Sequence, residues 1–146
     1  MKLIFLDIDG VLNDHSFNYE SQSLSLKSEC IWCFNQILNN INVSVVLSSA
    51  WRYMIHGGDI SLKGFEYLLR THGVSSKINI IGVTVLDELI QNRVDQTQYF
   101  IENCKHIEKY VVLDDIDFGW KSNFYKTNPY LGLQRKDIDP IIGMLR

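Results

Sequence analysis

The stretch that decides the fold is the N-terminal "MKLIFLDIDGVLND" (residues 1–14). Residues 2–8 form a short, mostly apolar run of the kind found in strands that are covered on both faces. This run ends in Asp7 and Asp9, and Gly10 follows directly. Two carboxylates on one side of an extended chain add charge repulsion to the cost of desolvation. The rest of the sequence must therefore supply something that stabilises negative charge at this point.

The 146 residues have the composition of a globular protein, with 46% hydrophobic and 21% charged residues. Because no repeat, low-complexity tract or linker divides the chain, we expect a single domain over residues 1–146. The net charge of −3 gives no general argument for nucleic acid or an anionic membrane as the partner. No apolar stretch approaches the ~18 residues that cross a bilayer, and no signal-peptide pattern is present. We therefore expect a cytoplasmic protein with no membrane partner.

Strand-like and helix-like segments alternate along the chain. Apolar runs predict strands at residues 2–8, 42–49, 77–83 and 109–117. Helical spacing of apolar residues predicts helices at residues 25–40, 62–73, from about Val94, and 137–145. This order predicts an α/β fold, a Rossmann-like three-layer α/β/α arrangement with a mainly parallel central sheet. The carboxyl ends of parallel strands share one edge, where ligands bind.

Each of three expected strands ends in polar residues. The first ends in Asp7 and Asp9, the second in Ser48 and Ser49, and the fourth in Asp114, Asp115 and Asp117. Asp7 with Asp114 or Asp115 offers the hard oxygen ligands that suit Mg²⁺, and the cation would neutralise the acids. A serine hydroxyl beside them suits a phosphoryl group. Two aspartates spaced i, i+2 can divide the work, one attacking phosphorus and the other transferring protons.

Several segments together carry a family resemblance. "FLDIDGVL" (5–12) resembles motif I of the haloacid dehalogenase-like (HAD) superfamily of phosphohydrolases, "VVLSS" (45–49) resembles motif II, and "YVVLDDID" (110–117) resembles motif IV. More narrowly, "LSSAWR", "GVTVL", "NRVDQTQYFIEN" and "LGLQRKDID" resemble a small HAD group, typified by the HAD domain of multifunctional RNA repair proteins. The motifs occur in the family's order over nearly the whole chain.

The resemblance implies a phosphoric monoester hydrolase with assigned roles. Asp7 would be the nucleophile that forms an aspartyl-phosphate, and Asp9 the general acid and base. Ser48 would hold the phosphoryl group. The Mg²⁺ ligands would be the side chains of Asp7 and Asp115, with Asp114 as a second ligand or its support, and the backbone carbonyl of Asp9.

Motif III is where the sequence departs from the superfamily pattern. The usual residue is a lysine near the start of the helix before the fourth strand. Here the matching place offers Arg93, while Lys105 and Lys109 lie too close to the strand. A guanidinium can also bind phosphate and neutralise the nucleophile. We therefore expect Arg93 to take the catalytic place of the lysine.

Residues in and directly after motif II, and the "CIWC" segment, have alternative interpretations. Ser49 is an alternative to Ser48 as the phosphate-binding hydroxyl. Trp51 and Arg52 should lie at the rim of the crevice, either as a packing tryptophan with a solvated arginine or as a stacking surface and a phosphate contact. "CIWC" (30–33) lies inside a predicted helix and lacks a second pair of ligands, so we expect buried core cysteines rather than a metal or redox site.

The chain is too short for the cap domain that many HAD enzymes carry, so we expect only a short flap at about residues 10–25. An open site implies a bulky phosphorylated substrate, such as a nucleic-acid end or a protein, or closure by a second subunit; small molecules are not excluded. A phosphotransferase or a non-catalytic module on the same scaffold are the alternatives. A response-receiver domain is excluded, because the third strand ends without an acid.

Overall fold

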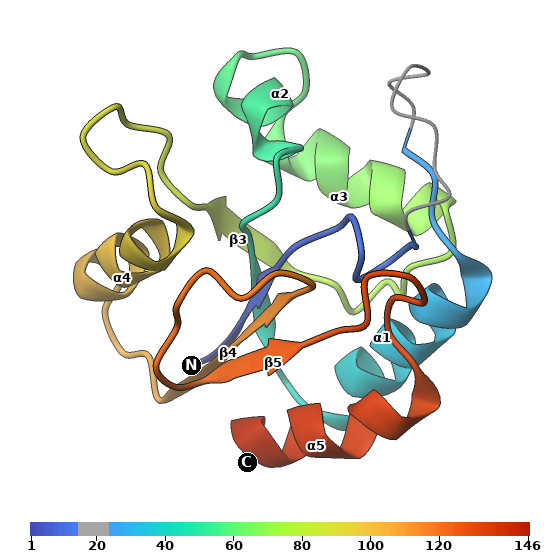
Figure 1. Cartoon of the computed structure of the whole chain (residues 1–146). Coiled ribbons are helices and arrows are strands. Elements are labelled where there is room, and N and C mark those ends of the chain that lie inside the picture. The colour runs from blue at the N-terminus through green and yellow to red at the C-terminus, as the bar shows by residue number, and fades with distance from the viewer. Residues whose placement is uncertain (15–23) are drawn as a thin grey trace.

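The sheet is built around β1 (Lys2–Leu6), its central strand. β1 pairs in parallel with β2 (Ser44–Leu47) on one side and with β4 (Lys109–Asp114) on the other. β3 (Ile80–Val83) extends the sheet beyond β2, and β5 (Phe124–Lys126) extends it beyond β4. The sheet of the described chain thus has the order β3-β2-β1-β4-β5, and every pairing in it is parallel (Figure 1).

Helices cover both faces of this sheet. Four consecutive residues of β1 are buried and alternate between two hydrophobic clusters: Leu3, Ile4, Phe5 and Leu6. The larger cluster includes residues of α1 (Ser28–Asn40), α3 (Leu62–Thr71) and α5 (Arg135–Leu145). On the opposite face, α4 (Arg93–Asn103) packs Phe100 and Ile101 against the smaller cluster. The predicted three-layer α/β fold is therefore confirmed.

The path of the chain predicts a ligand site beside β1. The chain leaves β1 for β2 and β3, and then returns past β1 to β4 and β5. Strand order therefore reverses between β1 and β4. In parallel α/β sheets, ligands bind outside the carboxyl ends of the strands at such a reversal.

Two short elements were missed by the sequence prediction. β5 has three residues, "FYK", too few to show an alternating pattern, and it pairs only with β4. α2 (Arg52–His56) is a single helical turn after β2. The strand that the sequence predicts at 109–117 ends earlier, at Asp114, and the acidic residues that follow lie in the loop.

The computed structural model describes residues 1–14 and 24–146. The flap that the sequence predicts at about residues 10–25 falls mostly on 15–23, outside the described residues. None of the described helices has the length and apolar character needed to span a membrane. Cys30 and Cys33 are buried free thiols on the core side of α1, as expected for core cysteines.

A buried glutamate joins α3 to β3. The Glu66 carboxylate accepts a hydrogen bond from the backbone N–H of Ile80 (2.8 Å) and pairs with Arg70 (2.9 Å). Its Oε2 also lies 3.6 Å from the Nζ of Lys63, which is solvent-exposed. The side chain of Glu66 therefore satisfies a buried donor at the start of an edge strand.

Glu66→Ala should lower the free energy of unfolding by about 1 to 3 kcal/mol, because it leaves the Ile80 N–H without its acceptor and removes the ion pair with Arg70. Urea denaturation monitored by circular dichroism measures this loss. Lys63→Ala removes only the exposed partner and should cost less than about 1 kcal/mol. Equal effects of the two substitutions would contradict the role of Glu66.

Candidate active site at the carboxyl edge of the sheet

The parallel register brings polar residues from neighbouring strands to one level. Leu6 pairs with both Leu47 and Leu113. The residue after each of these leucines is polar: Asp7, Ser48 and Asp114. The backbone hydrogen bonds continue through this level, since Asp7 N–H donates to Leu113 O (3.0 Å) and Ser48 N–H donates to Leu6 O (2.9 Å). Side chains at one register level of a sheet point to the same face. The sheet therefore aligns these three groups.

Three carboxylates meet at this edge. Asp7, Asp114 and Asp115 each offer an oxygen within 4.8 Å of the others, and the exposed fractions of the residues are 6%, 1% and 4%. Burial raises the pKa of Asp7 well above its ordinary value, and the neighbouring Asp114 adds to this shift. Burial also raises the pKa of Asp114, to about 6. The cluster resists full ionisation, as expected of acids that need a cation.

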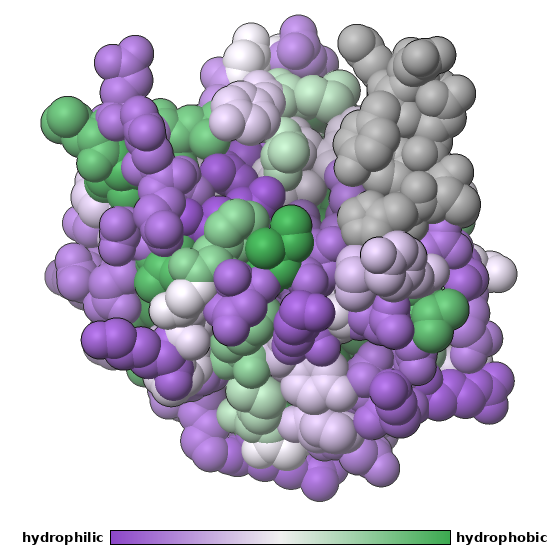
Figure 2. All heavy atoms as spheres, viewed as in Figure 1, coloured by the Kyte–Doolittle hydropathy of each residue, from purple (hydrophilic) through white to green (hydrophobic). Residues whose placement is uncertain are grey.

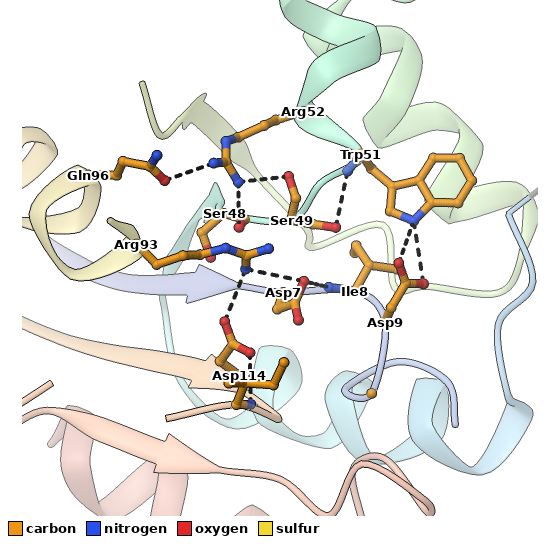
Figure 3. Close-up of polar contacts among 12 residues, drawn as sticks. Asp7, Ile8, Asp9, Ser48, Ser49, Trp51, Arg52, Arg93, Gln96 and Asp114 are labelled. Atoms are coloured by element: carbon orange, nitrogen blue, oxygen red, sulfur yellow. Dashed lines mark hydrogen bonds and ion pairs between the residues drawn. The ribbon is translucent and has the colours of Figure 1, made fainter. Parts of the chain in front are cut away.

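Arg93 supplies one positive charge to this cluster. Its Nη1 lies 3.1 Å from Asp114 Oδ2 and 3.6 Å from Asp7 Oδ1. The Asn92 side chain caps α4 by accepting from Val94 N–H, so that the helix begins at Arg93. The guanidinium carbon also lies 5.3 Å from the centre of the Phe118 ring. Arg93 therefore pairs with both Asp7 and Asp114, as Figure 3 shows.

The two candidate serines differ in their hydrogen bonds. Ser49 Oγ accepts from the backbone N–H of Trp51 (3.3 Å). The buried Ser48 Oγ has no hydrogen-bond partner among the described residues. A buried hydroxyl without a partner is unusual and points to a ligand that is bound during function. Ser48 is thus the serine whose side chain is available to a phosphoryl group.

Arg52 is not at the rim of the crevice, and it is not solvated. It is 3% exposed, with Nη1 donating to Ser48 O (2.8 Å) and Ser49 O (3.1 Å), and Nη2 donating to Gln96 Oε1 (2.8 Å). Burial lowers the pKa of Arg52. Sequence reasoning missed this because an arginine after a strand is usually exposed. In the structure, Arg52 links the turn that carries Ser48 to Gln96 of α4 and so braces this turn.

Asp9 lies outside the carboxylate cluster and is held by two donors. Asp9 Oδ1 accepts from Asn13 Nδ2 (3.0 Å), and Asp9 Oδ2 accepts from the indole Nε1 of Trp51 (3.2 Å). Figure 3 shows the Asp9 carboxylate and the indole N–H facing each other. Trp51 itself is half-buried. Sequence reasoning missed Asn13, whose only signal is a polar residue in the turn after Gly10.

Gly10 allows the cluster to close. Its φ is +84°, and a Cβ at this position would lie 2.4 Å from Asp115 Cγ. Any other residue would be strained and would push Asp115 away. The glycine that follows the two aspartates therefore has a steric reason at this site.

The donor set fits a hard divalent cation. Among the described residues, this is the one group of three or more acidic, histidine or cysteine side chains that can hold a metal ion. All of its ligand atoms are carboxylate oxygens, which suit Mg²⁺ better than a soft metal.

Exposed apolar side chains lie on the loops that follow β4 and β5. The loop after β4 exposes Ile116 and Phe118, and the loop after β5 exposes Tyr130 and Leu131. Figure 2 shows hydrophobic side chains across the middle of this face, where Figure 1 places the loop after β4. The acidic residues of the site are thus buried, whereas the loops after β4 and β5 expose apolar side chains.

A family model described as the HAD domain in Swiss Army Knife RNA repair proteins matches residues 3–138. The match runs from β1 into α5 and contains every site residue described above. Searches of curated proteins and of solved structures each gave no significant match.

The raised pKa of Asp114 predicts how stability changes with pH when no metal is bound. A carboxyl with a raised pKa in the folded state favours its protonated form, so its ionisation destabilises the fold as pH rises from about 4 through about 6. Asp114→Asn should therefore gain about 2 to 3 kcal/mol relative to the wild type between pH 4.5 and pH 7.5 in EDTA, as measured by urea denaturation.

The exposed Asp139→Asn serves as the matched control and should show no such gain. Because metal ligands must be deprotonated, Mg²⁺ should raise the melting temperature of the wild type more at pH 7.5 than at pH 5. An Asp114→Asn variant whose relative stability is the same at both pH values would contradict the assignment.

Proposed function

The chain belongs to the family of HAD domains found in Swiss Army Knife RNA repair proteins, and on this premise we propose that it is a Mg²⁺-dependent phosphomonoester hydrolase. Members of the HAD superfamily are typically phosphohydrolases. The observation that carries the proposal is the buried cluster of Asp7, Asp114 and Asp115 beside the unpartnered hydroxyl of Ser48. A purely structural role would leave the Ser48 hydroxyl without a partner among the described residues, and it would give no reason to bury three carboxylates within 4.8 Å of one another.

The phosphoryl group would be held by two residues, one in the turn after β2 and one on α4. Ser48 Oγ would donate to one of its oxygens, and Arg93 would pair with another. Both groups are fixed before the substrate arrives, Ser48 by the braced turn after β2 and Arg93 by the cap of α4. Preorganised donors of this kind stabilise charge in the transition state at little cost of reorganisation.

The first step is the transfer of the phosphoryl group to Asp7. A carboxylate oxygen of Asp7 attacks phosphorus, the bond from phosphorus to the leaving oxygen breaks, and Asp9 gives its proton to that oxygen. In the second step, Asp9 takes a proton from water as the water oxygen attacks phosphorus. The aspartyl-phosphate then releases inorganic phosphate and restores the Asp7 carboxylate.

The side chains of Asp7, Asp114 and Asp115 and the backbone carbonyl of Asp9 would hold Mg²⁺. When bound, the cation supplies charge neutralisation for the acids and for the phosphoryl oxygens. The carboxylate donor set supports this choice of metal.

The substrate class we propose is a phosphate monoester on a nucleotide or a nucleic-acid end. The family description supports this, since it names RNA repair proteins. The exposed apolar side chains at the crevice offer contact area for a sugar or base. We further propose that residues 1–146 act as one domain, and that a second subunit can close the open side of the site.

Wild-type protein should hydrolyse p-nitrophenyl phosphate with Mg²⁺ and lose this activity in EDTA. Asp7→Asn should lower kcat by at least about a thousandfold, because it removes the nucleophile. The matched control, Asp139→Asn, should retain activity. Oligonucleotides with a terminal phosphate and nucleoside monophosphates would then identify the preferred substrate.

A folded wild type that hydrolyses none of these compounds would contradict the proposal. Binding of beryllium fluoride, which mimics the aspartyl-phosphate, then separates two explanations. Mg²⁺-dependent binding would indicate an active nucleophile with a different substrate, and no binding would favour a non-catalytic module.

Arg93→Met should lower kcat/KM for p-nitrophenyl phosphate by roughly a hundredfold or more, because it removes the cation that faces the transferring group. Arg93→Lys should keep more activity than Arg93→Met, since it preserves the charge but loses the planar geometry. Arg135→Met, at an exposed arginine on α5, is the matched control. Unchanged activity in Arg93→Met would remove Arg93 from the proposed mechanism.

A further inference from the structure

The Asp9 carboxylate accepts hydrogen bonds from the indole of Trp51 and from the amide of Asn13, which lie in the turns after two neighbouring strands. Asn13 lies in the turn after β1, and its own amide is fixed by two further bonds. Its Oδ1 accepts from Gly10 N–H (2.9 Å), and its Nδ2 donates to Ser25 O (2.8 Å). Trp51 lies in the turn after β2. A carboxylate held by donors on both oxygens has little freedom to rotate.

The turn that carries Trp51 also carries Ser48. The backbone N–H of Trp51 donates to Ser49 Oγ, and Arg52 holds the carbonyls of both Ser48 and Ser49. One braced turn therefore determines the position of the phosphate-binding hydroxyl and the position of the indole N–H.

We propose that Trp51 is a positioning residue, which acts through its indole N–H to orient Asp9 toward the leaving oxygen of the substrate. This inference rests on the proposed function, because it needs Asp9 to act as the acid. It gives the half-buried indole a role beyond contact with the substrate. It also implies that the leaving group lies on the Trp51 side of the site, while Ser48 and Arg93 hold the phosphoryl group.

A packing role for Trp51 makes a different prediction. Its ring also contacts the main hydrophobic cluster, so its loss can lower stability. A merely structural loss should reduce the activity on every substrate by the same factor. Loss of orientation at Asp9 should instead depend on how much the leaving group needs a proton. An alkoxide needs one, whereas p-nitrophenolate is a stable anion and leaves without one.

Trp51→Phe should lower kcat for glycerol 2-phosphate at least about tenfold more than kcat for p-nitrophenyl phosphate, since a small displacement of a catalytic group can cost up to about a hundredfold. Trp32→Phe, at an exposed tryptophan on α1, is the matched control and should leave kcat for both substrates unchanged. In an Asp9→Asn background, Trp51→Phe should cause no further selective loss, because the group it orients is already absent.

If Trp51→Phe does not fold, replacement of Trp51 by 3-benzothienylalanine removes only the N–H and should give the same selective loss. Equal losses on both substrates, or a full further loss in the Asp9→Asn background, would overturn the role of Trp51. A wild type that hydrolyses p-nitrophenyl phosphate through Asp7 but not glycerol 2-phosphate would overturn it too. Absence of all Asp7-dependent turnover would instead overturn the proposed function itself.

Discussion

The burial of three carboxylates in one cluster is the constraint on which the site depends. Backbone N–H groups relieve part of the cost, since Ile8 donates to Asp7 Oδ1 (2.9 Å) and Ile116 donates to Asp114 Oδ1 (3.0 Å). Arg93 adds one positive charge. Ionisation of three carboxylates within 4.8 Å of one another remains costly, because burial strengthens their mutual repulsion. A divalent cation bound at this edge would neutralise part of the negative charge, which gives a reason for burying Asp7 beside Asp114 and Asp115.

Hydrogen bonds connect the other parts of this edge to one another. The central strand is buried on both faces, and its last residues are linked to β2 and β4 by backbone hydrogen bonds. The turn after β2 leads into α2, which is only five residues long, and the Arg52 side chain stabilises this turn. Its buried charge is tolerated because the guanidinium donates three hydrogen bonds, two to backbone carbonyls of the turn and one to Gln96 on α4. α4 thus anchors the turn and also supplies Arg93.

The parts of the site that the sequence predicted are those that follow from the linear position of a residue at the end of a strand. Asp7, Ser48 and Asp114 come together because parallel register aligns them, and apolar runs reveal strands well. The position of Arg93 followed from motif spacing. The roles of Arg52, Asn13 and the Trp51 indole depend on rotamers and turn geometry, which periodicity does not encode. β5 was missed because its pairing with β4, rather than its own three residues, makes it a strand.

The two sides of the crevice differ in what can select a substrate. On the inner side, the buried groups at the strand ends would meet the phosphoryl group, and the sheet fixes their positions. On the outer side, loops present the half-buried Trp51 and the exposed Ile116 and Phe118. Loops tolerate substitution far better than a buried register level does. The chemistry on phosphate should therefore depend on the sheet, and the choice of the group that carries the phosphate should depend on these loops.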